Sequence, residues 1–264
     1  EISARLSQLS SDFSNHVLDA TQAFVLPLED AQLKGLPDSS IALLKQYGQQ
    51  RELEQPVATL DFPSCLAVMT YAQDRALREE LYKAYTTRAS EQSEHTEFDN
   101  SEIMQEILSL RQEMAQLLGF ENYAAYSLAS KMAPNVQTVF DFLNELAEHA
   151  RTPALQEIAE LKAIAQQDGI EELQPWDSSF YSEKLKQQQF NLSQEALKPY
   201  FPAPKVVQGL FEIVQRLYGI QIQERTAPVW QPDVRYFEIE DKGQIIGGFY
   251  LDLYARSGKR GGAW

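Results

Sequence analysis

Apolar residues recur at steps of three and four over the first two thirds of the chain, which predicts a series of helices. The clearest stripe predicts one amphipathic helix over residues 2–24. Its members are Ile2, Leu6, Leu9, Phe13, Val17, Ala20 and Phe24. No capping side chain precedes this stripe, because the chain starts at Glu1.

Capping residues, prolines and glycines divide the rest of this region into further helices. Pro153 lies inside the longest of them, and we expect it to bend or interrupt that helix near Arg151 because proline lacks a backbone N–H. Residues 57–62 are expected to be extended. The expected helix starts are Asp38 or Ser39, Pro63, Asp74, residues 99–101, Asn122, Asn135 and residues 175–177, and the expected stops include Gly119 and residues 167–169.

Near the C-terminus the period of the apolar pattern changes from that of a helix to that of a strand. A helix over residues 202–218 is expected to stop at Gly219, before two extended segments over 220–223 and 234–240. The sequence Asp241-Lys242-Gly243 then predicts a hairpin turn into a returning strand over residues 245–253.

The predicted fold class is therefore mainly α, with a helical bundle-like body and a small antiparallel β-sheet near the C-terminus. We divide the chain into a helical region over residues 1–170 and a second region over residues 171–264, in which helices precede the hairpin.

The composition is that of a soluble globular protein with an acidic surface. Hydrophobic residues make up 44% of the 264 residues, and 38 acidic side chains against 23 basic ones leave a formal net charge of −15. Nucleic acids and anionic membranes favour basic partners, so we expect neither to bind this chain. No apolar run approaches the ~18 to 20 residues of a membrane span, and no signal-peptide pattern opens the chain.

Familiar nucleophile and phosphate motifs are missing from the sequence. The single cysteine, Cys65, fits a reducing cytoplasm, and its place in an apolar run favours a buried hydrophobe over a nucleophile. No Gly-x-Ser-x-Gly elbow occurs. The glycine-rich tail departs from a phosphate-binding loop at two positions, because Arg260 stands where Ser or Thr is needed and Leu253 where the first Gly belongs.

A metal site built from histidines is a further hypothesis. The three histidines, His16, His95 and His149, lie far apart in the sequence, and none pairs with another at the i, i+4 spacing of two ligands on one helix face. Such a site would need the fold to bring them together. Ordinary surface or half-buried histidines are the favoured interpretation.

The glycine pair Gly247-Gly248 lies inside the last predicted strand. Two missing side chains would let another backbone approach, as an extended peptide does when it adds to a sheet edge. A β-bulge or tight packing on a neighbour explains the same pair, and the residues alone favour that alternative. The nearby Arg256, Lys259 and Arg260 would receive a carboxylate or pair with the acidic body.

The tail from Gly248 to Trp264 resembles the stretch just before the catalytic helix in the thimet oligopeptidase family of zinc metallopeptidases. Further blocks resemble that family in the same order over nearly the whole chain. They are Val-Met-Thr-Tyr at 68–71, Ala-Leu-Arg-Glu-Glu at 76–80, Leu-Leu-Gly-Phe-Glu-Asn-Tyr-Ala at 117–124, Leu-Gln-Pro-Trp-Asp at 173–177 and Tyr-Ser-Glu-Lys at 181–184.

The resemblance implies a zinc held by two histidines of a His-Glu-x-x-His helix and a further glutamate, with the glutamate of the motif activating water. No His-Glu pair occurs in this sequence, so it implies that every metal ligand and the general base lie beyond Trp264. The resemblance thus implies a central fragment that lacks both ends and holds no catalytic or metal-binding residue of its own.

The resemblance also implies a larger, channel-containing helical fold in which a small sheet aligns an extended peptide. It places Gly247, Gly248, Phe249 and Tyr250 on a peptide-aligning strand and makes residues 171–264 the start of the catalytic region. It implies a cytoplasmic zinc metalloendopeptidase that hydrolyses short peptides, of which this fragment alone is inactive. Truncation should expose apolar surface near the hairpin and Trp264, through which the fragment would self-associate. The alternative from another class is an acidic helical protein-interaction module without catalytic activity.

Overall fold

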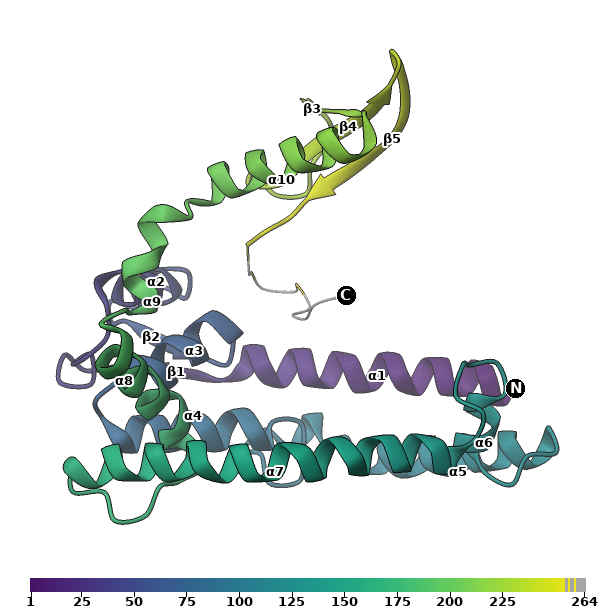
Figure 1. The fold of residues 1–264 in the computed structure, drawn as a ribbon, viewed down its shortest axis with the longest axis horizontal. Helices are drawn as coiled ribbons and strands as arrows, with labels where there is room; N and C mark the ends of the chain where they lie inside the picture. The colour runs from purple at the N-terminus through teal and green to yellow at the C-terminus, as the bar shows by residue number, and fades with distance from the viewer. Residues whose placement is uncertain (255, 257–258, 260–264) are drawn as a thin grey trace. The chain divides into compact units, whose positions relative to one another are not determined.

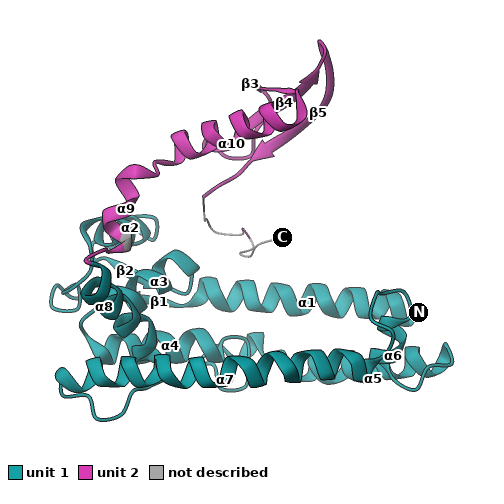
Figure 2. Cartoon of the chain, in the orientation of Figure 1, with its two compact units in different colours: residues 1–190 teal, residues 191–264 magenta. Residues whose placement is uncertain are grey.

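The computed structural model describes residues 1–254, 256 and 259. Their contacts form two compact units, unit 1 over residues 1–190 and unit 2 over residues 191–264 (Figure 2). This division does not coincide with the boundary that the sequence suggested between residues 170 and 171. The mainly helical fold with a small antiparallel sheet near the C-terminus is confirmed.

Unit 1 consists mostly of helices (Figure 1). They are α1 (Ile2–Ala23), α2 (Asp38–Gln49), α3 (Phe62–Tyr71), α4 (Arg75–Thr87), α5 (Ser101–Leu117), α6 (Tyr123–Leu128), α7 (Val136–Gln167) and α8 (Ser178–Phe190), with the short 3₁₀ turns η1 (Thr96–Phe98) and η2 (Pro175–Asp177). Strands β1 (Val25–Pro27) and β2 (Val57–Thr59) pair antiparallel. Only β2 was predicted. Strand β1 has just three residues, the last of them proline, which is too short to show the alternation of apolar and polar residues typical of a strand.

Several predicted caps are confirmed by the hydrogen bonds at the helix starts. Asp74, Asn122 and Asn135 each accept the backbone N–H of the residue three positions on. The expected cap at residues 38–39 is wrong, because Pro37 precedes the helix and Asp38 is its first residue. The predicted helix start at residues 99–101 is confirmed, because α5 begins at Ser101, although the Asn100 side chain makes no capping hydrogen bond.

Pro153 does not interrupt α7, which runs unbroken over 32 residues, so the predicted interruption is wrong. Proline removes one backbone N–H donor from a helix. The many remaining hydrogen bonds of so long a helix outweigh that single loss.

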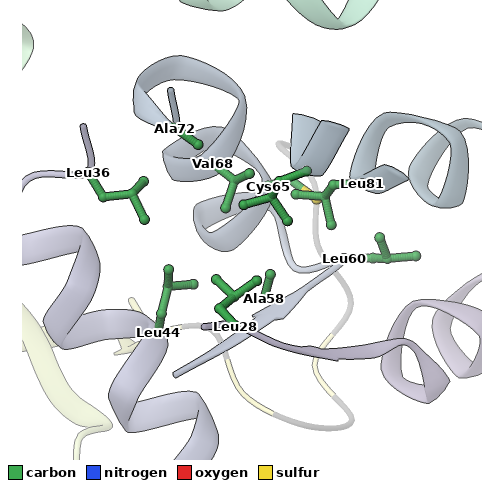
Figure 3. Close-up of a cluster of buried hydrophobic side chains, with 10 residues drawn as sticks. Leu28, Leu36, Leu44, Ala58, Leu60, Cys65, Val68, Ala72 and Leu81 are labelled. Carbon is green, nitrogen blue, oxygen red and sulfur yellow. The ribbon is translucent and has the colours of Figure 1, made fainter. Parts of the chain in front are cut away.

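The main core of unit 1 lies where α2, α3 and α4 meet the β1–β2 sheet (Figure 3). Cys65 is one of its members and is 7% exposed, and its thiol donates to the carbonyl oxygen of Thr59 at 3.4 Å. Burial raises the pKa of Cys65 to about 12. The prediction that Cys65 is a buried hydrophobe is confirmed. The core residues are Leu28, Leu36, Leu44, Ala58, Leu60, Cys65, Val68, Ala72, Leu77 and Leu81.

Unit 2 contains the short α9 (Gln194–Leu197), the 3₁₀ turn η3 (Lys198–Tyr200), the long α10 (Ala203–Tyr218) and strands β3 (Gln221–Arg225), β4 (Arg235–Asp241) and β5 (Gln244–Leu251). The strands form an antiparallel sheet in the order β3-β4-β5. Gly219 ends α10 with a φ of 69°, as predicted, because glycine tolerates the left-handed region. The predicted hairpin turn between β4 and β5 is confirmed.

Candidate functional site

Strand β5 carries all four residues that the sequence analysis placed on a peptide-aligning strand. Gly247 lies opposite Ile239 of β4, Gly248 opposite Glu238, Phe249 opposite Phe237, and Tyr250 opposite Tyr236. The register slips between Ile239 and Glu240, so that Ile246 of β5 has no partner residue. The glycine pair therefore directly follows a bulge, as one of the structural alternatives foresaw.

Successive side chains of β5 point to opposite faces of the sheet. On one face Phe211 of α10 meets Phe237 and Phe249 edge to face, with ring centroids 4.9 and 6.0 Å away. These aromatic contacts attach α10 to the sheet.

The other face carries three neighbouring aromatic side chains, Trp230, Tyr250 and Tyr236, which we call the aromatic row. Trp230 belongs to the loop between β3 and β4, and its ring centroid lies 5.1 Å from that of Tyr250. The ring centroid of Tyr250 in turn lies 4.8 Å from that of Tyr236. Trp230 is 54% exposed and Tyr250 is 42% exposed, so this face of the sheet offers accessible aromatic surface.

The two glycines of β5 have different surroundings. A Cβ atom added to Gly248 would lie 2.2 Å from the hydroxyl oxygen of Tyr236 and 2.8 Å from its Cζ. A Cβ on Gly247 would meet no atom within 4 Å among the residues described. Gly248 therefore makes room for the Tyr236 phenol, whereas none of the described residues requires glycine at 247.

Strand β5 is an outer strand, and its second edge has no partner strand in the described part of the chain. Alternate residues of such a strand direct their N–H and C=O groups away from the sheet. Many edge strands are protected by charged residues. The other outer strand, β3, carries Glu224 and Arg225, whereas β5 holds no charged residue between Gln244 and Leu251. The β5 edge is thus the better template for pairing with an extended chain.

Asp252 anchors the segment that follows β5. Its carboxylate accepts hydrogen bonds from the guanidinium of Arg256 and from the indole Nε1 of Trp230 at 3.1 Å. The Lys259 ammonium donates to the backbone oxygens of Asp252 at 2.7 Å and Tyr254 at 3.0 Å. The hydrogen bonds from Arg256, assisted by Lys259 and Trp230, hold the pKa of Asp252 well below its usual range.

Two of the basic tail residues are therefore paired within the segment itself. From the residues alone, Arg256 and Lys259 could either receive a carboxylate or pair with the acidic body. Both bind Asp252, a few residues away. Arg260 and Trp264 lie outside the described residues.

The three histidines do not come together. His16 lies on α1 with its Nδ1 3.0 Å from Oδ1 of Asn100, whereas His149 lies on α7 and is largely exposed. His95 precedes η1 and lies 3.4 Å from a carboxylate oxygen of Glu97. Over residues 1–254, 256 and 259, no group of three or more His, Cys, Asp and Glu side chains has a geometry suited to a metal ion.

Sequence reasoning missed Tyr236, Trp230 and Asp252. Their roles depend on the pairing of β4 with β5, and the bulge at Ile246 hides that register. The aromatic alternation around the hairpin was a usable signal, because a correct register would have placed Tyr236 opposite Tyr250.

No helix within the described residues is both long and apolar enough to cross a membrane.

Comparison with known proteins gives a consistent set of relatives. The model of peptidase family M3 matches residues 68–264. Oligopeptidase A of Escherichia coli strain K12 is 54% identical over the whole of this chain, and that of Haemophilus influenzae is 50% identical. Dipeptidyl carboxypeptidase of Escherichia coli is 35% identical, again over the whole chain. The chain spans 39–40% of the length of these relatives.

The family match covers most of the chain and the relatives align with all of it. The resemblance inferred from the sequence blocks is thereby confirmed, and the chain belongs to peptidase family M3.

Proposed function

We propose that this chain is part of a zinc metalloendopeptidase that hydrolyses short peptides. The support is its membership of peptidase family M3 and the names of its relatives, oligopeptidase A and dipeptidyl carboxypeptidase. A peptidase from this family is favoured over an acidic interaction module, because the similarity to peptidases extends along the entire chain.

The described residues do not fit a zinc ion. They provide no cluster of three or more suitable ligands, and the sequence contains no His-Glu-x-x-His motif. We therefore propose that the zinc ligands and the general base come from outside these 264 residues. The chain by itself then cleaves no peptide.

The contribution of this chain is to bind and orient the substrate. A peptide in extended form would add to the open edge of β5, with backbone hydrogen bonds supplying affinity. The observation that carries this proposal is the outer position of β5 together with its uncharged sequence from Gln244 to Leu251. Phe249 packs against α10 on one face of the sheet, and Tyr250 belongs to the aromatic row on the other. The aromatic row is therefore the part of the sheet that could contact side chains of the bound peptide.

We further propose that the protein acts in the cytoplasm on peptides alone, with neither nucleic acid nor membrane as a partner. The support is a net charge of −15 and the single cysteine, which is buried and unpaired. One relative, 41% identical, bears the name probable cytosolic oligopeptidase A of Arabidopsis thaliana.

The proposal is tested with an internally quenched peptide of about ten residues, which fits an extended strand. The full-length protein that contains this chain should cleave it, lose activity in a chelator and regain it with Zn²⁺. The purified 264-residue chain should show no cleavage in any of these conditions. Chelator-sensitive cleavage by the 264-residue chain alone would contradict the assignment of the zinc ligands to other parts of the protein.

A further inference from the structure

The Tyr236 side chain extends from β4 across the sheet onto β5. Tyr236 lies opposite Tyr250 in the register, and Gly248 is its diagonal neighbour on the same face. The hydroxyl oxygen lies so close to Gly248 that a Cβ there would be 2.2 Å away. The phenol therefore ends above the outer strand of the sheet, beside its open edge.

The hydroxyl end of the ring is the part that requires glycine. The position of the added Cβ is 2.2 Å from the hydroxyl oxygen, 2.8 Å from Cζ and 3.1 Å from Cε2. The ring also packs on Tyr250, and phenylalanine would keep that contact. Packing on Tyr250 therefore accounts for the ring of Tyr236 but not for its hydroxyl group.

The Tyr236 hydroxyl has no hydrogen-bond partner in the described part of the chain. A phenol hydroxyl both donates and accepts a hydrogen bond. In the aromatic row, Trp230 Nε1 already donates to Asp252, whereas the Tyr250 hydroxyl, like that of Tyr236, bonds to no described residue. What distinguishes Tyr236 from Tyr250 is that its hydroxyl lies over Gly248 of the outer strand.

We propose that Tyr236 is a substrate-binding residue, whose hydroxyl hydrogen-bonds a peptide chain paired with the open edge of β5. Gly248 serves this role by letting the phenol reach over the strand. The inference rests on the proposed function, because it needs an extended peptide at that edge. It adds a specific polar contact from β4 to the backbone contacts that β5 supplies.

The test uses the full-length protein with the variants Tyr236→Phe and Gly248→Ala. Tyr236→Phe keeps the ring and removes the hydroxyl, so KM should rise about two- to tenfold, the size of one lost neutral hydrogen bond, while kcat changes less than about twofold. Gly248→Ala displaces the same hydroxyl and should also raise KM. Because both changes remove one contact, the double variant should show no more than the larger single effect.

Matched controls come from the same unit. Tyr218→Phe removes an exposed hydroxyl at the end of α10, and Gly209→Ala adds a methyl group where no described atom lies within 4 Å. Both should leave KM and kcat as in the wild type. An unchanged KM for Tyr236→Phe, or KM effects that multiply in the double variant, would overturn the proposal, because the phenol would then serve packing alone.

A binding measurement separates this inference from the proposed function. The dissociation constant of the fluorescently labelled peptide is measured by anisotropy in chelator, where no cleavage is expected. A wild type that binds the peptide but never cleaves it overturns the proposed activity, while weaker binding by Tyr236→Phe still supports the role of the hydroxyl. A wild type that neither binds nor cleaves overturns both.

Discussion

Arg78 donates a hydrogen bond from Nη2 to Oδ1 of Asp177 at 2.9 Å, and the two side chains are only 2% and 0% exposed. Arg78 Nε donates to the backbone oxygen of Trp176 at 3.2 Å, and Nη1 donates to those of Ala72 and Gln73 at 2.6 and 3.4 Å. Arg75 adds a partly exposed ion pair to the same carboxylate. This arrangement fixes η2 against the start of α4.

Removal of one partner from this buried pair should destabilise unit 1 strongly. We expect Asp177→Ala to lower the free energy of unfolding by about 3–5 kcal/mol, because the Arg78 charge stays buried without its partner. Arg5→Ala is the control, since the Arg5–Glu106 pair is exposed and should contribute little. Urea unfolding of the three proteins measures the difference. Equal midpoints for Asp177→Ala and Arg5→Ala would contradict the account.

The Asp177 carboxylate should also make the free energy of unfolding depend on pH. Burial alone would raise the pKa of Asp177, but hydrogen bonds from Arg75, from the Gln174 backbone N–H and from Arg78 outweigh it and lower the pKa below its ordinary value. Because the pKa of Asp177 is lower in the folded than in the unfolded state, the ionised carboxylate stabilises the fold at every pH above the unfolded-state pKa of about 3.9. This contribution is lost as the pH falls below that value.

The difference in unfolding free energy between wild type and Asp177→Asn should therefore be constant near neutrality and shrink below about pH 4. Urea midpoints measured between neutral and acidic pH provide the test. A difference that grows on acidification would show that the sign of the shift is wrong.

Cys65 should react slowly with thiol reagents in the folded protein. Its raised pKa, about 12, leaves almost no thiolate at pH 8, and its burial blocks access. In denaturant the thiol has an ordinary pKa of about 8.5 and should react within the mixing time of a standard assay. Absorbance of a released chromophore measures both rates, and equal rates would contradict the buried position.

The two glycines of β5 should differ in their tolerance of alanine. Gly248→Ala forces the Tyr236 ring to move and should cost about 1–3 kcal/mol of stability, as overpacking does. Gly247→Ala has no described neighbour within 4 Å and should cost less. Thermal unfolding followed by circular dichroism compares them. A larger loss for Gly247→Ala would contradict the placement of the phenol over Gly248.

The outer face of α10 is expected to drive self-association. Val206, Leu210, Ile213 and Leu217 recur at helical spacing and are 50–71% exposed, while Phe211 packs on the sheet. We expect sedimentation velocity to show dimers or larger species of the 264-residue chain that dissociate in Leu210→Glu. The exposed Lys205→Glu is the control for the added charge. A wild-type chain that sediments as a monomer at every concentration would contradict this prediction.

Local signals predicted most of the fold. Gly219 and the Asp241-Lys242-Gly243 turn required backbone conformations that few other residues adopt, and both are found where the sequence placed them. Asn122 and Asn135 likewise mark helix starts by their own chemistry. Such features depend on neighbours within a few residues, so sequence patterns reveal them.

Contacts between distant segments were not predictable in the same way. Asn100 directly precedes α5, and its side-chain amide donates to the Phe13 carbonyl at 3.2 Å, which joins the start of α5 to α1. Arg78 and Asp177 lie 99 residues apart in sequence. The fit of Tyr236 over Gly248 depends on a strand register that a bulge displaces by one residue. These features follow from tertiary packing and carry no local signature.

The proposed function requires an extended peptide to pair with the open edge of β5. Amide hydrogen exchange of the full-length protein, with and without a non-hydrolysable peptide analogue, tests it most directly. Amides of residues 244–251 that point away from β4 should exchange at least about tenfold more slowly in the complex, because pairing closes them from solvent. Amides of β3 should not change. Unchanged exchange in β5 under saturating peptide, or protection of β3 instead, would contradict the claim.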